Sequence, residues 1–562
     1  YSQCLPTVAL SGVVLDDQRL PVAGARVTAD TGVATTTDDG AFVLERVGLT
    51  ESVSVEADGY QPVRLSVWPP GERQVVLTPR TFLLVVRDAE TNHAIPEARI
   101  AAGPARVQPL EPGRFAIGPA RSDLRLTLGA PGYADVTLPY GGEAELLARL
   151  ERRLAGTVVD ARTGRPIPNT FVGFSGGSAI SGRDGAFELS TRPTGPVRVL
   201  APGYRRVEVD PGGSGALELR LEPFAVKGLY LSFYGIGHQG LRTNALELAE
   251  KTEVNALVID VKGDRGWIAY QSDVPLAEEI GANDEHTIPD IRELLASLKR
   301  RGLYTIARIV VFKDDKLARN GARAGVDVAI KDAATGKAWI DREDLGWVDP
   351  FRPEVWEYNI ALAREAIEKG FDEVQFDYIR FPTDPSRGTT IGAAQYSRPV
   401  NEASRVEAVT EFLRQARDEV RGAGGFLGVD IFGYVTLDAD DIGIGQQLEA
   451  LAGVVDYLHP MVYPSAYSAG LPGKINYPQV VARPYEVVYE SMKRARERAE
   501  GRGAVMRPWL QYFDDYPWET KKAYNAPEIA AQRKAAADAG SSGWMMWDPT
   551  NKYARGGFEP ER

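Results

Sequence analysis

The chain has 562 residues, and at roughly 150 residues per domain this length predicts three or four domains instead of one compact core. Asp and Glu outnumber Lys and Arg by 77 to 65, so the net charge is −12 and we expect neither nucleic acid nor an anionic membrane surface as a partner. One cysteine excludes a disulfide within the chain, and with only four scattered histidines it excludes a zinc site of the Cys/His type. Apolar runs stay below the ~18 residues of a membrane-spanning helix.

The start of the sequence suggests an exported protein. It reads Tyr1-Ser2-Gln3-Cys4 without an initiator Met, which is typical of a processed chain. We therefore expect an extracytoplasmic location, which means periplasmic, cell-surface or secreted. Cys4 lacks the small residue that precedes a lipidated cysteine, so we expect an inert thiol there.

The first 223 residues contain a threefold repeat. Its clearest mark is a Gly-Tyr pair, which occurs at Gly59-Tyr60, Gly132-Tyr133 and Gly203-Tyr204. Between these marks, short runs alternate apolar and polar residues and are bounded by Asp-Gly or Pro-Gly turns, a pattern typical of small antiparallel β-sandwiches. The pattern predicts three β-sandwich domains, at residues 1–79, 80–151 and 152–223. Each unit resembles the carboxypeptidase regulatory-like (transthyretin-like) domain.

We find no catalytic constellation in these repeats. They fit a spacer or tether that positions another domain. The alternative is carbohydrate binding through Trp68, Tyr133 or Tyr204, although tyrosines in Gly-Tyr pairs usually pack inside the domain.

From about residue 224 onward, apolar strand-like runs alternate with helical patterns, which indicates a parallel sheet. Proline and glycine mark the helix ends, as at Pro353 and Gly370. Eight such units predict a (β/α)₈ barrel at residues 224–562. The expected strands are Gly228–Tyr234, Ala256–Lys262, Tyr304–Phe312, Glu373–Ile379, Phe426–Gly433, Tyr457–Tyr463, Met506–Phe513 and Gly543–Trp547.

The chemistry of such barrels lies at the carboxyl ends of the strands. Carboxylates and aromatic side chains dominate these positions, whereas a Ser or Cys nucleophile with a His partner and a phosphate-binding Gly loop are both missing. Glycoside hydrolysis requires this combination, because one acid protonates the leaving oxygen and a second, ionised, attacks the sugar or activates water. The candidates are Tyr234, Asp260, Lys262, Asp314, Asp315, Asp377, Tyr378, Arg380, Asp430, Tyr463, Gln511, Asp514, Trp547 and Asp548.

The strongest segment is the predicted fourth strand. Its period of two puts Glu373, Gln375 and Asp377 on one face, which we expect to point into the barrel lumen with Asp377 uppermost. Arg380 follows directly and could hold Asp377 ionised by lowering its pKa. The alternative is a purely structural ion pair that closes the top of the barrel.

Several motifs together resemble a bacterial glycoside hydrolase domain family whose members are distant relatives of the α-amylase-like barrels. They include Phe376-Asp377-Tyr378-Ile379-Arg380-Phe381-Pro382, Asp430-Ile431-Phe432-Gly433-Tyr434 and Gly543-Trp544-Met545-Met546-Trp547. The similarity covers about residues 225–556 and implies a barrel hydrolase that acts on a polysaccharide. The chain departs from the family at Asp548, where Asn is frequent, and at Ala466, where His is frequent.

By analogy with related barrels, the resemblance implies that Asp377 is the nucleophile and Asp430 the acid/base. Apolar neighbours of Asp430 would raise its pKa as an acid role requires, but a buried Asp that hydrogen-bonds the adjacent strand is an equal alternative. Asp260 shares a strand face with Lys262, so we expect an ion pair between them. His459 is expected to be a core residue, and Trp509 and Trp544 to be packing residues.

We therefore predict a glycoside hydrolase, endo-acting and retaining, with an extracellular or capsular polysaccharide as its partner, no cofactor and no metal, although a calcium site stays open. Its catalytic residues would be Asp377 and Asp430. The alternatives are a non-catalytic carbohydrate-binding scaffold and a transglycosylase. The segment Pro382–Asn401, with Gly388 and Gly392, is a lid, a subsite wall or an idle loop. The predicted substrate contacts are Tyr234, Asp260, Lys262, Tyr378, Arg380, Tyr463, Gln511, Trp547 and Asp548.

Overall fold

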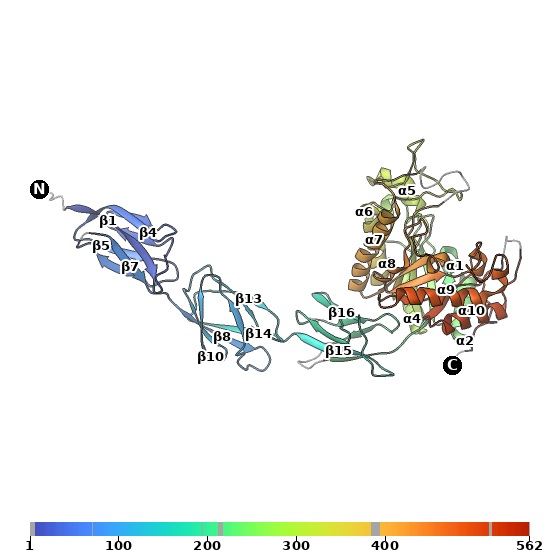
Figure 1. Cartoon of the computed structure of the whole chain (residues 1–562), viewed down its shortest axis with the longest axis horizontal. Helices are drawn as coiled ribbons and strands as arrows, with labels where there is room; N and C mark the ends of the chain where they lie inside the picture. Colours follow the sequence, from blue (N-terminus) through green and yellow to red (C-terminus); the bar gives the residue numbers. More distant parts are fainter. Residues whose placement is uncertain are drawn as a thin grey trace. The chain divides into compact units, whose positions relative to one another are not determined.

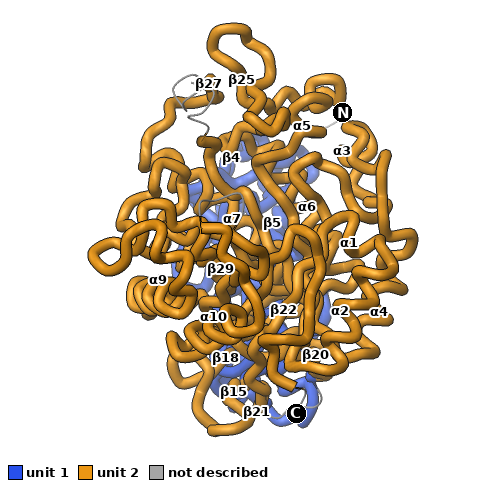
Figure 2. Tube along the Cα trace, turned by 90° about the vertical axis from the view of Figure 1, so that its right-hand side faces the viewer, with its two compact units in different colours: residues 1–155, 188–194, 211–217 blue, residues 156–187, 195–210, 218–562 orange. Residues whose placement is uncertain are grey.

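The computed structural model describes residues 6–69, 71–193, 195–211, 217–383, 394–515 and 520–560. It divides into two compact units (Figure 2): residues 1–155, 188–194 and 211–217 form one, and residues 156–187, 195–210 and 218–562 form the other. Cys4 and the glycines Gly388 and Gly392 of the predicted lid lie outside the described residues.

Three pairs of small sheets form the β-sandwich region (Figure 1). The first repeat contains β1 (Thr7–Asp16), β2 (Arg26–Ala29), β3 (Gly32–Thr35), β4 (Ala41–Gly48), β5 (Ser52–Glu56), β6 (Val63–Ser66) and β7 (Arg73–Leu77). The second contains β8 (Phe82–Asp88), β9 (Arg99–Ala101), β10 (Arg106–Glu111), β11 (Arg114–Gly118), β12 (Arg125–Gly129), β13 (Val136–Pro139) and β14 (Glu145–Leu150). The third contains β15 (Leu154–Asp160), β16 (Phe171–Phe174), β17 (Gly177–Ile180), β18 (Ala186–Leu189), β19 (Val197–Leu200), β20 (Val207–Val209) and β21 (Leu217–Leu221).

Most strand pairs in these sandwiches for which a direction is given are antiparallel, as in β1 with β4 and β12 with β13. In the first two repeats the last strand runs parallel to the first, β7 with β1 and β14 with β8. Alternating buried and exposed residues along strands such as β7 supply the apolar core between the two sheets.

The tyrosines of the Gly-Tyr pairs pack inside their own repeats. The hydroxyl of Tyr133 donates to Asp88 at 2.8 Å, and that of Tyr204 donates to Asp160 at 3.0 Å. Each of these aspartates ends the first strand of its repeat. The repeated motif is therefore a structural clasp in these two units, whereas Trp68 stays 63% exposed.

Eight parallel strand positions close into a barrel, because β28 pairs with both β26 and β29 and thereby joins the two ends of the sheet. The prediction of a (β/α)₈ barrel is confirmed. The seventh position is split around Arg507 and Pro508 into two short strands. The barrel strands are β22 (Val226–Leu231), β23 (Ala256–Lys262), β24 (Tyr304–Val310), β26 (Glu373–Asp377), β28 (Phe426–Phe432), β29 (Tyr457–Met461), β30 (Val505–Met506), β31 (Trp509–Gln511) and β32 (Gly543–Trp547).

Helices surround this barrel and have the end signals that the sequence contains. Asp290 caps the helix that begins at Ile291, and Gly370 ends the helix that Pro353 opens. Within the described ranges, each helix is too short or too polar to cross a membrane. The helices are α1 (Phe233–Gly237), α2 (Gln239–Lys251), α3 (Pro275–Glu279), α4 (Ile291–Arg300), α5 (Asp315–Asn320), α6 (Pro353–Lys369), α7 (Glu402–Ala423), α8 (Leu448–Ala452), α9 (Pro484–Ala499) and α10 (Ala526–Asp538).

Part of the third repeat covers the amino-terminal mouth of the barrel. Leu200 at the end of β19 joins an apolar cluster that includes the first residues of several barrel strands, among them Tyr304, Phe426 and Tyr457. Arg206 pairs with Asp372 at 2.9 Å, just below the fourth barrel strand. The opposite, carboxyl-terminal mouth is therefore the one left for a site.

Candidate active site

A column of buried polar side chains fills the barrel lumen beneath the candidate site. Glu373, Gln375 and Asp377 all point inward, as the period of β26 predicts. Glu373 accepts from Arg507 at 2.9 Å, and the Gln375 amide lies 2.6 Å from the Nδ1 atom of His459. Burial, followed by the charge of Arg507, lowers the pKa of His459, so this imidazole stays neutral. Asp377 is the top of the column and the first of its members to reach a cavity.

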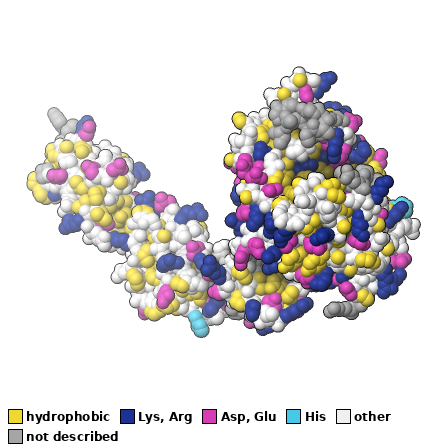
Figure 3. All heavy atoms as spheres, turned by 45° about the vertical axis from the view of Figure 1, so that its right-hand side comes forward, with side chains coloured by type: hydrophobic (Ala, Val, Ile, Leu, Met, Phe, Trp, Pro, Cys, Tyr) yellow, Lys and Arg dark blue, Asp and Glu magenta, His cyan; other side chains and the backbone are white. Residues whose placement is uncertain are grey.

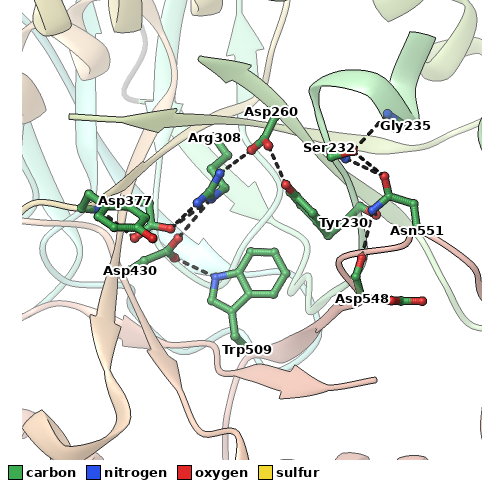
Figure 4. Close-up of polar contacts among 11 residues, drawn as sticks. Tyr230, Ser232, Gly235, Asp260, Arg308, Asp377, Asp430, Trp509, Asp548 and Asn551 are labelled. Carbon is green, nitrogen blue, oxygen red and sulfur yellow. Dashed lines mark hydrogen bonds and ion pairs between the residues drawn. The ribbon is translucent and has the colours of Figure 1, made fainter. Parts of the chain in front are cut away.

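One guanidinium, that of Arg308, links three carboxylates at the top of the barrel (Figure 4). Its Nη1 atom donates to Asp260 at 2.5 Å and its Nε atom donates to Asp377 at 3.1 Å. The Oδ2 atom of Asp430 lies 3.9 Å from the same Nε. Arg308 points inward from β24, and its side chain is only 6% exposed, so one guanidinium lies against three acids in a nearly dry place.

Burial raises the pKa of two carboxyl groups in this cluster, Asp260 and, more strongly, Asp430. Asp430 is 1% exposed, and burial together with the negative charge of Asp377 raises its pKa well above the ordinary value. The indole nitrogen of Trp509 donates to its Oδ1 atom at 2.8 Å. Asp377 lies closer to Arg308 and accepts a further hydrogen bond, 2.6 Å long, from the backbone N–H of Tyr378. The two carboxyl groups therefore differ in their surroundings, because Asp377 accepts more hydrogen bonds and Asp430 is more deeply buried.

The two carboxyl groups face a common cavity of about 190 Å³. Their Oδ2 atoms lie 3.1 and 3.9 Å from one nitrogen of Arg308, so the two oxygens are no more than about 7 Å apart, a spacing compatible with a glycosidase carboxylate pair. Trp547 and Tyr463 also line this catalytic cavity. Burial and the charge of Asp430 raise the pKa of Tyr463, which keeps its hydroxyl available as a hydrogen-bond donor.

The backbone turns sharply directly after Asp377. Tyr378 has φ = 52°, in the left-handed region that non-glycine residues rarely occupy. This turn brings the N–H of Tyr378 onto the carboxylate of Asp377 and places the Tyr378 and Arg380 side chains at the cavity. The guanidinium of Arg380 lies 4.9 Å from the ring centre of Trp347 and 5.0 Å from that of Phe432. Arg308 takes the place at Asp377 that we expected for Arg380.

The prediction of an ion pair between Asp260 and Lys262 was wrong. A β-bulge between these two residues shifts the register of β23 against β24, so Lys262 leaves the face that Asp260 occupies. Asp260 instead accepts from Arg308 and from the Tyr230 hydroxyl, and Lys262 pairs with Asp314 at 2.5 Å. Lys262 is fully buried and lies 5.2 Å from the ring centre of Tyr358 in α6, so the structure places it between the barrel wall and the helices.

Three further candidates lie apart from the carboxylate pair. Gln511 is buried and holds Ser465 by two hydrogen bonds, of 2.8 and 3.1 Å. Asp548 accepts from Thr550 and the backbone of its own loop and lines a second, larger cavity. Tyr234 is 64% exposed on α1 and lines neither cavity. The structure thus gathers Asp260, Asp377, Tyr378, Arg380, Asp430, Tyr463 and Trp547 around Arg308.

Sequence reasoning missed Arg308 and Tyr230 and assigned Trp509 to packing only. A signal for Arg308 exists, because it is the single charged residue in the apolar run from Tyr304 to Phe312. It also lies on the same strand face as Ile306 and Tyr304, two and four positions earlier, which point into the barrel. Nothing in the local sequence indicates that the Trp509 nitrogen would reach Asp430, since the two residues come from different strands. Among the described residues, no group of three or more His, Cys, Asp or Glu is arranged to hold a metal ion.

Comparison with known proteins gives one family match and several similar solved structures. In solved structures the chain is similar to a hypothetical protein from Ruminiclostridium thermocellum (34% identity, 36% of this chain, 96% of that chain, TM-score 0.31). It is also similar to the glycoside hydrolase domain of PgaB from Bordetella bronchiseptica, with 14% identity over 60% of this chain and 99% of that chain and a TM-score of 0.41. A chitinase from Chromobacterium violaceum has 12% identity over 59% of this chain and 96% of that chain, with a TM-score of 0.34. No curated protein matches the chain. Residues 228–553, more than half of the chain, match the family described as "Putative glycosyl hydrolase domain", and the protein belongs to this family of barrel glycoside hydrolases.

Proposed function

We propose that the barrel hydrolyses internal glycosidic bonds of an extracellular or capsular polysaccharide, with Asp377 as nucleophile and Asp430 as acid/base. The observation that supports this most is the shared guanidinium of Arg308. It lies against both carboxyl groups, holds Asp377 in contact and leaves Asp430 at 3.9 Å, where burial favours its protonated form. Two carboxyl groups in different protonation states are what glycosidic bond cleavage needs.

In the proposed first step, Asp377 attacks the anomeric carbon and forms a glycosyl ester, while the bond between that carbon and the glycosidic oxygen breaks. Protonated Asp430 gives its proton to this oxygen, so the leaving sugar departs with a free hydroxyl group. Asp430, now ionised, then removes a proton from water, which hydrolyses the ester with net retention. Retention requires carboxyl groups about 5–5.5 Å apart, whereas about 6.5–9.5 Å would leave room for direct attack by water and inversion. Proton NMR of the first-formed sugar anomer tests this step, and an inverted product would contradict it.

The location that we propose is outside the cytoplasm, where such polysaccharides occur. For the β-sandwich repeats we propose the role of a spacer or tether, because Tyr133 and Tyr204 are hydrogen-bonded within their own repeats.

The decisive test screens the full chain against a panel of bacterial exopolysaccharides and measures released reducing ends. Asp377→Asn should lower the rate by about 10³-fold or more while glycan binding persists. Asp315→Asn is the matched control, because this aspartate also follows a barrel strand but pairs with Arg319 at the surface. Equal release by the wild type and Asp377→Asn would contradict the proposed roles. Binding without release by either protein would favour a carbohydrate-binding scaffold, and products longer than the substrate would favour a transglycosylase.

A further inference from the structure

A second cavity lies on the same mouth of the barrel as the catalytic one. Its volume is about 960 Å³, and its walls come from the loops that follow β29, β31 and β32 and from the start of α10. The proposed catalytic residues lie at that same mouth, Asp377 as the last residue of β26 and Asp430 two residues before the end of β28. We refer to this second space as the outer cavity.

Two aromatic contacts join the outer cavity to the catalytic cavity. Trp547 lines both spaces. Tyr463 of the catalytic cavity and Phe513 of the outer cavity meet edge to face, with ring centres 5.7 Å apart. The two cavities are therefore direct neighbours, with Trp547 between them.

The difference in volume between the two cavities indicates that they would hold different parts of a substrate. The catalytic cavity, at about 190 Å³, is smaller than the ~300–1,000 Å³ of ordinary ligand sites, and the outer cavity is at the upper end of that range. Enzymes commonly use contacts with remote parts of a substrate to hold the reacting part in place. The outer cavity is the place next to Asp377 and Asp430 where this larger contact can form.

The walls of the outer cavity are held rigidly. Gln511 fixes Ser465 by two hydrogen bonds, and the hydroxyl of Tyr512 accepts from the Ala554 backbone N–H at 2.7 Å. The carboxylate of Asp548 accepts from the N–H groups of Thr550, at 2.9 Å, and Lys552, at 3.1 Å. A preformed wall lowers the conformational entropy that binding must overcome.

The chemistry of these walls fits uncharged sugars. Trp547, Tyr512 and Phe513 are half-buried and offer aromatic surface to the apolar faces of sugar rings, and the polar groups around them can bind hydroxyls. A polyanionic chain would need a cluster of Arg and Lys. Lys552 is the one basic residue among the described residues that line the cavity, and it is offset by Asp514.

We propose that the outer cavity binds several uncharged sugar units of the polysaccharide chain whose scissile unit occupies the catalytic cavity. This inference rests on the proposed function for the identity of the ligand as a glycan, but it concerns binding and does not require cleavage. Ala466 is exposed at the edge of the outer cavity, so Ala466→Trp would fill the space without removing any contact described above.

The test is affinity electrophoresis of the full chain carrying Asp377→Asn, so that cleavage cannot interfere. The gels contain soluble starch, mixed-linkage β-glucan, dextran, galactomannan or glycol chitin, with alginate as the polyanion. We expect at least one neutral polymer to slow migration, and Ala466→Trp to weaken that affinity by about tenfold or more. Ala469→Trp, an exposed position three residues later that lines neither cavity, should leave it unchanged.

Ala554→Trp, a second exposed position in the outer cavity, should give the same loss if Ala466→Trp unfolds at a lower temperature than its parent. Unchanged affinity in well-folded blocking variants, retardation by alginate alone, or no retardation by any neutral polymer would overturn the inference. Binding that the blocking variants abolish, in a protein whose wild-type form cleaves nothing, would support the inference while contradicting the proposed hydrolysis.

Discussion

Two clusters in this protein contain the same three residue types, tyrosine, aspartate and arginine, yet they differ in what they can do. In the second repeat, Asp88 accepts from Tyr133 and from Arg152, each at 2.8 Å. In the barrel, Asp260 accepts from Tyr230 and from Arg308, each at 2.5 Å. Residue type and contact geometry alone therefore do not separate a structural clasp from a candidate active site.

Charge balance and access to water separate them. Asp88 accepts two further backbone N–H bonds at 2.9 Å, and its partner Arg152 is 45% exposed, so one acid meets one solvated base. Arg308 is nearly buried and faces Asp377 and Asp430 as well as Asp260. Burial and the neighbouring carboxylate of Asp377 raise the pKa of Asp430, which is the property that an acid catalyst needs.

Arg308→Met should have the largest effect, because it leaves Asp260 and Asp377 without their buried base. We expect loss of detectable cleavage and a decrease in the free energy of unfolding of about 3–5 kcal/mol. Urea unfolding followed by tryptophan fluorescence measures this. Arg152→Met is the matched change in the other cluster and should leave cleavage untouched. If Arg308→Met kept its activity, the link between the shared guanidinium and catalysis would be broken.

Asp430→Asn tests whether the Asp430 carboxyl group binds a proton in the folded protein, through the dependence of stability on pH. Burial and the charge of Asp377 raise the folded-state pKa of Asp430, so the folded protein binds this proton more tightly than the unfolded chain. Its contribution to stability is complete below the unfolded-chain value of about 4 and is lost as pH rises through the raised pKa. Unfolding in urea at a series of pH values should show a shallower decrease above pH ~4 for the variant, and its rate of cleavage should be strongly reduced. Parallel curves for variant and wild type would rule out a titrating Asp430.

Asp88→Asn should have the smallest effect and the opposite dependence on pH. Burial raises the pKa of Asp88, but the N–H groups of Thr91 and Glu90 with the hydroxyl of Tyr133 outweigh it, so the net shift is downward. Its contribution to stability is therefore present above about pH 4 and is lost as pH falls through the lowered pKa. Amide hydrogen exchange in β8 and β14 measures this, and we expect the acid sensitivity to disappear in the variant with cleavage unchanged. A change in cleavage would show that the clasp is not purely structural.

Much of the fold could be predicted because apolar periodicity and helix-end residues are local signals. The strands β23 and β32 have the predicted bounds, and the inward stripe that ends at Asp377 follows from the period of a strand. The first barrel strand differs, since Ser232 caps a short helix and ends the strand before Tyr234.

The site itself depends on contacts between strands, which single-sequence patterns do not encode. The bulge in β23 moves Lys262 to the outer side of the barrel, and one inserted residue is enough for this because side chains alternate between faces. Likewise, Arg308 and Trp509 reach Asp430 from separate strands. Residues that act through neighbours distant in sequence are the ones that the prediction missed.

Part of the third repeat covers the amino-terminal mouth of the barrel, and this contact determines where a shorter fragment of the protein can begin. A fragment that begins at residue 224 would present the rings of Tyr304, Phe426 and Tyr457 to water and would be prone to self-association. A fragment that begins at residue 152 keeps the whole of β15, Leu200 over these rings and the pairing of Arg206 with Asp372. The natural minimum for expression, screening and crystallisation is therefore the barrel together with the repeat that precedes it.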